Sequence, residues 1–100
     1  MEPTRLNDSQ IAAALEKLPG WTLQEGKMHR EYKFANFVGA FIFMTGVALI
    51  AQEMDHHPEW FNAWNLVRVD LATHDVGGVS SLDAKLAYAM EELAGRQGAK

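Results

Sequence analysis

The histidines are the residues of this chain whose types and spacing most clearly suggest chemistry. His56 and His57 are adjacent, Pro58 and Trp60 follow them, and His74 lies one predicted strand further along. The charge of histidine changes between about pH 5 and 8, so this side chain donates or accepts a proton near neutrality at little cost. Pro58 interrupts the helix, and the resulting change in backbone direction can let both adjacent imidazoles face one cleft. The pattern therefore favours an active site that works by acid–base catalysis.

Two other interpretations of the histidines are structural and metal-binding. In the first, one histidine ends a helix at the surface and the other fills space. In the second, the three histidines with Asp83 or Asp55 supply the ligands of a catalytic zinc ion. The chain has no His-Glu-x-x-His pair at helical spacing, and adjacent histidines seldom bind one ion together. The sequence therefore favours a site without a metal.

Asp83 and Trp60 are further candidates, each with a structural alternative. Residues 80–83 match a capping box, in which the Asp83 carboxylate accepts a hydrogen bond from the Ser80 amide at the start of a helix. The same carboxylate can also orient a histidine, and its position along the chain does not choose between the two roles. Trp60 and Trp64 would offer an aromatic wall to a flat heterocycle. Core packing or a subunit interface is the stronger interpretation for Trp64.

Hydrophobic periodicity and turn residues predict three helices and four strands, in the order α-β-β-α-β-β-α. Helices are expected from a cap at residues 7–9 to Leu18, from Asn36 to about His56, and from Ser80 to residue 94. The second should end there because Pro58 disfavours helical backbone in the residue before it. Strands are expected at residues 21–24, 28–34, 60–64 and 67–73. This order predicts an α+β fold, with an antiparallel sheet and the helices gathered on one of its faces.

The predicted second helix is apolar on nearly all sides. One stripe is formed by Phe37, Phe41, Met44, Ala48 and Ala51, and five further apolar residues fall outside it: Val38, Ile42, Val47, Leu49 and Ile50. A helix of this kind must be covered on more than one side, and a single sheet covers only one, so we expect a partner subunit. The uncharged run at residues 36–52 stops short of the roughly 20 apolar residues that span a bilayer. We therefore expect no membrane segment.

Size and composition narrow the classes of protein further. The 100 residues fit a single domain, with a core at about residues 7–94 and a frayed C-terminal tail. The net charge of −4, without a Lys/Arg stripe, argues against a nucleic-acid-binding protein. No cysteine is present, which excludes disulfides and thiolate metal sites. The N-terminus lacks a signal-peptide pattern, and we expect a cytoplasmic protein.

Together these motifs resemble those of the pterin-4a-carbinolamine dehydratase family. The resemblance lies in Asp-His-His-Pro-Glu-Trp-Phe-Asn at residues 55–62, Leu-Ala-Thr-His at residues 71–74 and Gly-Val-Ser-x-x-Asp at residues 78–83. Leu-Pro-Gly-Trp at residues 18–21 and Phe-x-Phe-Met-Thr at residues 41–45 are also similar. The similarity extends over residues 7–93 with its spacings intact.

The resemblance implies an enzyme that removes water from 4a-hydroxytetrahydrobiopterin, giving quinonoid dihydrobiopterin. This step recycles the pterin of aromatic amino acid hydroxylases. The resemblance also implies that the dehydratase itself uses no metal and no organic cofactor. The implied assembly is a homodimer or homotetramer of subunits with three helices on one face of a four-stranded antiparallel sheet. The residues matching the family's catalytic histidines are His56, His57 and His74. Those matching residues that shape or bind at the pterin pocket are Pro58, Trp60 and Asp83.

Two points stay open at the level of sequence. The family often carries an acidic residue four positions before the first histidine, where this chain has Gln52. Glu53 or Asp55 would then have to tune the histidine instead. The competing function is a non-catalytic dimeric adaptor that keeps the fold and the pocket.

Overall fold

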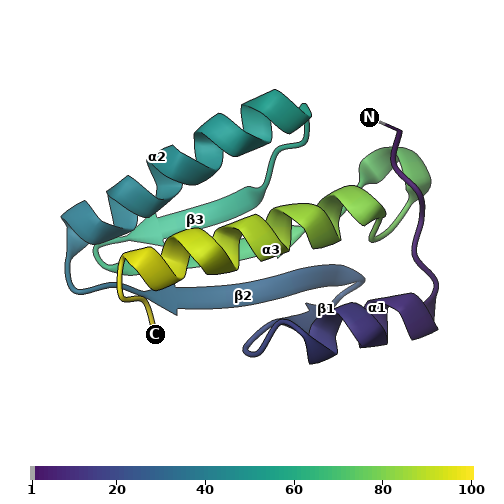
Figure 1. Cartoon of the computed structure of the whole chain (residues 1–100), viewed down its shortest axis with the longest axis horizontal. Coiled ribbons are helices and arrows are strands. Elements are labelled where there is room, and N and C mark those ends of the chain that lie inside the picture. The colour runs from purple at the N-terminus through teal and green to yellow at the C-terminus, as the bar shows by residue number, and fades with distance from the viewer. Residues whose placement is uncertain (1) are drawn as a thin grey trace.

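The computed structural model describes residues 2–100 and contains the predicted helices and strands in the predicted order (Figure 1). The helices are α1 (Asp8–Glu16), α2 (Phe37–Met54) and α3 (Ser81–Arg96), and a short 3-10 helix, η1, covers His74–Val76. The strands are β1 (Thr22–Gln24), β2 (Lys27–Lys33), β3 (Glu59–Ala63) and β4 (Leu66–Leu71). The predicted α+β fold is confirmed.

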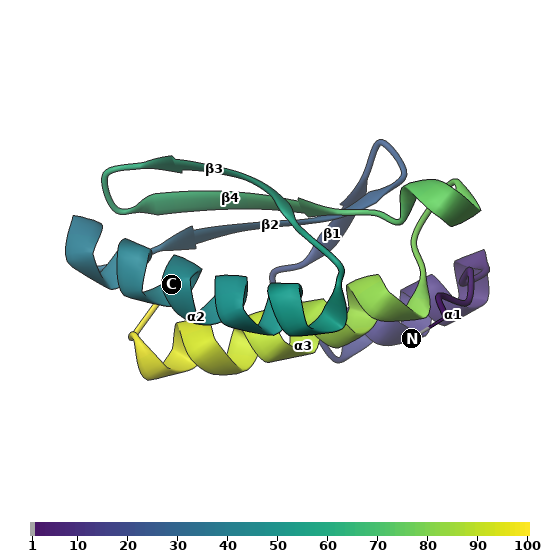
Figure 2. The ribbon, with the colours of Figure 1, turned by 90° about the horizontal axis from the view of Figure 1, so that it is seen from above.

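The four strands form one antiparallel sheet in the order β1-β2-β4-β3. β2 and β4 lie in the middle of the sheet, where Met28 is paired with Leu71 and Lys33 with Leu66. The three α-helices all lie against one face of the sheet, which Figure 2 shows from the side. Within residues 2–100 no helix covers the opposite face, so the central strands β2 and β4 pack one side in the core and turn the other outward, whereas all three residues of β1 are exposed.

Aromatic rings from β2 and α2 fill the centre of the core. The ring of Phe43 on α2 lies 5.1 Å from the ring of Tyr32 and also 5.1 Å from that of Phe34. Arg30 lies on the same inward side of β2, with its guanidinium carbon 4.6 Å from the centre of the Tyr32 ring and a hydrogen bond to the Pro19 carbonyl. The aliphatic part of Arg30 can therefore pack in the core while its charged end reaches polar partners.

The C-terminal residues are hydrogen-bonded to the sheet, which corrects the prediction of a frayed tail. α3 continues to Arg96, and Lys100 exchanges two backbone hydrogen bonds with Lys33, at 2.8 and 2.9 Å. Ala99 packs against the core. The tail was unpredictable because backbone pairing between residues this far apart leaves no pattern in the local sequence.

α2 turns a different face to the core from the one that its predicted stripe indicated. The buried residues are Ala40, Phe43, Val47 and Ala51, whereas Phe37 and Phe41 are about half exposed. On a helix that is apolar all round, periodicity cannot identify the inward face, and packing against the sheet and α3 decides it. With 18 residues and a mean hydropathy of 1.7, α2 is long and apolar enough to cross a membrane. Core helices of soluble proteins also have these properties, so this finding is weak support for a membrane segment.

The uncovered face of the sheet carries a histidine between two carboxylates. His29 on β2 contacts Asp70 through Nδ1 at 2.8 Å and Glu31 through Nε2 at 3.0 Å, and only 11% of its side chain is exposed. Burial by itself lowers the pKa of His29. The hydrogen bonds to Asp70 and Glu31, together with their charges, outweigh burial and raise the pKa above its ordinary value of 6.5. The folded protein thus favours the imidazolium, in which both ring nitrogens donate.

We expect His29 to make the stability of the protein depend on pH. Because folding raises the pKa, the contribution of His29 to the free energy of unfolding is fully present below the unfolded value of 6.5. It is lost as the pH rises through the folded-state pKa. Urea unfolding of the wild type and His29→Gln between about pH 5.5 and 9 should give a difference that is largest at the acid end. Both proteins contain the nearby charged residues Lys27, Arg68 and Glu59, so the titration of these groups largely cancels in the difference between the two free energies of unfolding. A difference that is constant, or that grows with pH, would contradict this account.

Candidate active site

The three histidines predicted to be catalytic line one hollow at the end of the sheet. The hollow has a volume of about 290 Å³. Its lining residues are Asp55, His56, His57, Glu59, Ala72, Thr73, His74 and Asp75. They come from the connection between α2 and β3 and from the segment where β4 leads into η1, which lie at the same end of the molecule in Figure 2.

α2 ends before His56, earlier than predicted, because Asp55 turns the chain. Asp55 has left-handed backbone angles, φ 51° and ψ 42°, which aspartate adopts more readily than most residues. The amides of Asp55 and His56 donate to the carbonyls of Gln52 and Ala51, at 3.2 and 3.0 Å, the pattern that closes a helix before a sharp turn. The turn separates the adjacent imidazoles, so that His56 is buried and His57 is exposed.

His56 is held by a carboxylate that has no exposed surface of its own. Nε2 of His56 lies 2.6 Å from Oδ1 of Asp83, whose side chain is 0% exposed. An ionised carboxylate only accepts hydrogen bonds, so the proton of this contact belongs to Nε2 of His56. Nδ1 is then the unprotonated ring nitrogen of the neutral imidazole. Asp83 thus fixes both the orientation and the tautomer of His56.

The second oxygen of Asp83 is held by Ser80, the residue before α3, and by Thr73, which follows β4. Oδ2 accepts hydrogen bonds from the Ser80 amide and the Thr73 hydroxyl, both at 2.8 Å. Since Thr73 gives its hydroxyl proton to Asp83, the Ser80 hydroxyl, 2.6 Å from that of Thr73, donates to Thr73. The predicted capping box of α3 is present. Asp83 therefore caps α3 and orients His56 at the same time.

His57 and His74 are exposed at the mouth of the hollow. Nε2 of His57 donates to Oε1 of Gln52 at 3.1 Å, which again leaves Nδ1 uncommitted. Glu53 and Asp55 were the acidic residues considered as substitutes for the family's usual carboxylate, but Gln52 makes the contact with His57. The hydrogen-bond partner of His57 is therefore a neutral amide. His74 begins η1, and its side chain forms no hydrogen bond with the described part of the chain.

Comparison with known proteins assigns the chain to a family. Residues 4–93 match the family model described as "Pterin 4 alpha carbinolamine dehydratase". The chain belongs to the pterin-4a-carbinolamine dehydratase family. A protein of Solibacter usitatus (strain Ellin6076) named "Putative pterin-4-alpha-carbinolamine dehydratase" is 52% identical over 91 residues, which cover 91% of this chain and 96% of the relative. A protein of the same name from Prochlorococcus marinus (strain MIT 9303) is 50% identical over 93 residues, with coverages of 93% and 97%.

A solved structure has the same fold. The crystal structure of a "transcriptional coactivator/pterin dehydratase" from Brucella melitensis matches with a TM-score of 0.87 and 47% sequence identity. The match covers 91% of this chain and 99% of the Brucella chain. The arrangement of helices and sheet described above is therefore shared with this Brucella protein.

Not every residue that the family resemblance assigned to the pterin pocket lines the hollow. Asp83 is fully buried and in hydrogen-bond contact with His56, and its side chain does not line the hollow, so its assignment to the pterin pocket stays a prediction. Trp60 is half-buried and packs against the core. Pro58 is not among the lining residues either. Trp64 is 69% exposed, which excludes its interpretation as a core residue and leaves that of an interface residue.

The described side chains are not arranged as a metal centre. Among residues 2–100, no group of three or more His, Cys, Asp or Glu side chains is placed to hold a metal ion. The Nε2 atoms of His56 and His57 are each committed to a different hydrogen bond, one to Asp83 and one to Gln52. The zinc ligand set considered for the sequence is therefore not assembled.

Two residues at the site, Thr73 and Glu59, were not predicted from the sequence. Thr73 continues the inward alternation of β4, and a hydroxyl at such a position needs a buried partner, so a signal for it existed. Glu59 lines the hollow, and its carboxylate lies 2.6 Å from Nζ of Lys27. β2 and β3 are not neighbours in the sheet, and no local pattern predicts a contact between them.

We expect Asp83→Asn to lower the free energy of unfolding by about 2–4 kcal/mol. Asparagine keeps one of the two oxygens, so its amide nitrogen would face donors on one side only, either the His56 ring at Oδ1 or the Thr73 hydroxyl and Ser80 amide at Oδ2. Urea denaturation measures the change. Asp75→Asn is the matched control, because Asp75 is exposed in the same hollow. Equal effects of the two substitutions would show that the buried network is not needed for stability.

Proposed function

We propose that this protein dehydrates 4a-hydroxytetrahydrobiopterin to quinonoid dihydrobiopterin and water by histidine acid–base catalysis. The observation that carries the proposal is the placement of His56, His57 and His74 around one hollow. Membership of the family supports a pterin as the substrate. In the cell the activity would recycle the pterin of aromatic amino acid hydroxylases, and we propose a cytoplasmic location.

The reaction needs two proton transfers that balance within one turnover. The bond between C4a and the hydroxyl oxygen breaks, and the oxygen leaves with the bonding electrons and takes up a proton to become water. N5 loses its proton as its electrons form the double bond to C4a. One group must act as acid and another as base, and imidazoles suit both roles near neutral pH. We propose His56 and His57 as this pair, with His74 positioning the substrate or assisting a transfer.

The surroundings of the two imidazoles support this pairing. Each has Nε2 engaged and Nδ1 uncommitted, so each can exchange a proton with a ligand through the same ring atom. When His56 carries a proton on both nitrogens, the buried Asp83 carboxylate balances the charge. His57 is oriented by the neutral amide of Gln52, so its support is geometric rather than ionic.

The test follows the decay of the 4a-hydroxypterin spectrophotometrically with and without purified protein. The wild type should accelerate the decay, and His57→Ala should lower kcat/KM about 10²–10⁴-fold, because a positioned acid or base is lost. His29→Gln is the matched control, since it removes an imidazole outside the hollow, and it should keep the wild-type rate.

Two results of this assay would count against the proposal. Full activity in His57→Ala would exclude His57 from the acid–base pair. Decay at the spontaneous rate with the wild type would favour the non-catalytic dimeric adaptor, which needs the fold and not the chemistry.

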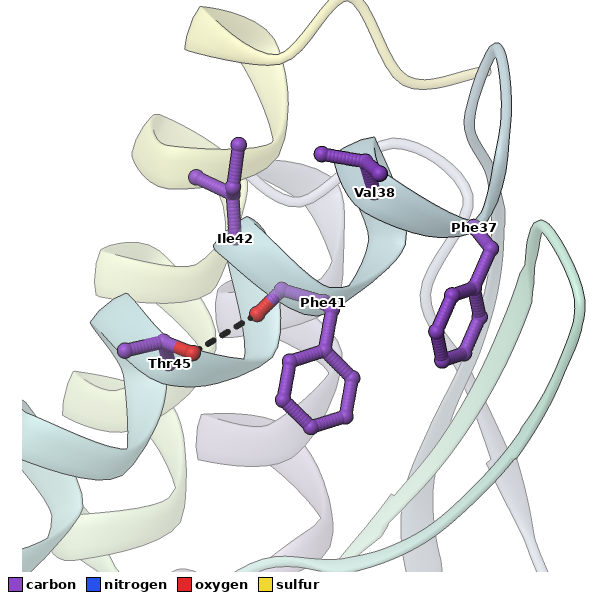
Figure 3. A pocket seen from close by; sticks show the side chains of 5 residues that line it. All are labelled: Phe37, Val38, Phe41, Ile42 and Thr45. Atoms are coloured by element: carbon purple, nitrogen blue, oxygen red, sulfur yellow. Dashed lines mark hydrogen bonds between the residues drawn. The ribbon is translucent and has the colours of Figure 1, made fainter.

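We propose further that the exposed side of α2 joins copies of this chain into a homodimer or homotetramer. This side carries a shallow apolar hollow of about 390 Å³ (Figure 3). Its lining residues are Phe37, Val38, Phe41, Ile42 and Thr45. The rings of Phe37 and Phe41 lie 5.5 Å apart. The Thr45 hydroxyl donates to the Phe41 carbonyl at 2.9 Å, so its hydrogen-bonding capacity is used within the helix.

A second copy suits this surface because the surface is apolar and uncharged. No charged residue occurs from Asn36 to Gln52, so two such helices can approach around a two-fold axis without repulsion. Val38, Ile42 and Leu49 are each more than half exposed, and soluble monomers rarely expose apolar patches of this kind.

We expect Phe41→Glu to dissociate the assembly, because it places a charge in the centre of the contact. Sedimentation velocity of the wild type should give a dimer or a larger closed oligomer, and Phe41→Glu should sediment as a monomer. Leu23→Glu is the control, since Leu23 is also about half exposed but lies on β1. A monomeric wild type would contradict the proposal, and its binding to lipid vesicles would identify a membrane as the cover of α2.

A further inference from the structure

Among the three histidines of the hollow, His74 alone has a side chain that forms no hydrogen bond with residues 2–100. His56 is held by Asp83, and His57 is held by Gln52. The place of His74 at the hollow therefore depends on the backbone that carries it.

That backbone is η1, a single 3-10 turn between Thr73 and Gly78. The amide of Thr73 donates to the Gly78 carbonyl at 2.8 Å, and the amide of Gly78 donates to the Thr73 carbonyl at 3.4 Å. Gly77, with φ 67°, reverses the chain after the turn. A turn this short has few hydrogen bonds of its own, so contacts from outside help to fix its position.

The N-terminal segment passes beside η1 and the start of α3 (Figure 1). Arg5 forms an antiparallel bridge with Ser80. The amide of the next residue, Leu6, donates to the Val79 carbonyl at 2.9 Å, and the Leu6 side chain packs against the core. The backbone of Arg5 is therefore fixed next to the turn that carries His74.

The guanidinium of Arg5 reaches from there to the end of η1. Its Nη1 donates to the carbonyl of Val76 at 3.2 Å, and the charge of the donor strengthens such a bond. The rest of the guanidinium lies against Gly78, where an added Cβ atom would be 3.6 Å from Nε, 3.6 Å from Nη2 and 3.7 Å from Cζ. Because these distances are nearly equal, the flat face of the guanidinium covers the glycine. Arg5 thus contacts the last residue of the turn and the glycine that closes it.

We propose that Arg5 is a positioning residue for His74, because it holds η1 from outside and so keeps the third imidazole at the hollow. The inference rests on the proposed function. Arg5 is not among the lining residues of the hollow, so it acts through the turn and not on the substrate. Loss of its side chain should displace His74. His56 and His57 should stay in place, because each has a partner of its own.

The NMR signals of the histidine rings test the effect of Arg5 on position. Arg5→Met, which keeps an unbranched side chain and removes the guanidinium, should shift or broaden the ring signals of His74 and leave those of His56 and His57 unchanged. Arg96→Met is the matched control and should change none of them, since it removes an exposed guanidinium at the opposite end of α3 from η1. Unchanged signals of His74, or equal changes in all three histidines, would overturn the inference.

The kinetic test is a double-mutant cycle with His74→Ala, since a residue that acts through His74 has no effect once that imidazole is gone. Arg5→Met alone should lower kcat/KM for the 4a-hydroxypterin about three- to ten-fold, as expected for the loss of one exposed hydrogen bond from a charged group. In the His74→Ala background it should lower kcat/KM no further. Arg96→Met should keep the wild-type rate.

The outcomes separate this inference from the proposed function. A wild-type rate in Arg5→Met, or the same loss with and without His74, would overturn the inference and leave the dehydratase in place. If the wild-type protein does not accelerate the decay, the proposed function fails. The ring signals then decide by themselves whether Arg5 positions His74, because they do not depend on catalysis.

Discussion

The buried carboxylate of Asp83 is the interaction on which the rest of the site depends. It has no exposed surface, and it accepts hydrogen bonds from the ring of His56, the hydroxyl of Thr73 and the amide of Ser80. A buried charge without partners costs several kcal/mol, so the three donors must stay where Asp83 needs them. They belong to the segment after α2, the segment after β4 and the N-cap of α3. One side chain therefore holds together the three pieces of chain that form the end of the sheet.

This constraint explains why two adjacent histidines have different surroundings. The left-handed backbone of Asp55 ends α2 and allows His56 to turn inward to a buried carboxylate, while His57 turns outward to the amide of Gln52. A helix continuing through both residues would have directed their side chains about 100° apart on a regular surface. The turn instead places two unlike imidazoles at the same hollow. That of His56 is buried against the carboxylate of Asp83, and that of His57 is exposed and bonded to the neutral amide of Gln52. An acid–base pair needs such unlike members, because one must hold a proton while the other accepts one.

α2 links the site to the surface of the molecule. Its last turn supplies Gln52 to His57, its inner side packs on the sheet and α3, and its outer side carries Phe37, Phe41 and Leu49 into solvent. A partner that covers the outer side would also restrain the end of α2 from which the histidine segment departs. The same helix would then contribute both to the contact between subunits and to the position of the histidines in the hollow.

Local patterns in the sequence were enough to predict the elements, their order, the fold class and the three histidines that line one hollow. These were predictable because capping boxes, the turn before β2, the alternation of β4 and the His-His-Pro motif are local patterns. Three features could be read only from the folded structure: which side of α2 is buried, the pairing of Lys100 with Lys33, and the contact of the buried Asp83 with His56. The same holds for the contact of Lys27 with Glu59 beside the histidines. Each of these joins residues far apart in the chain, and such contacts are set by how the sheet and helices pack, which local patterns do not encode.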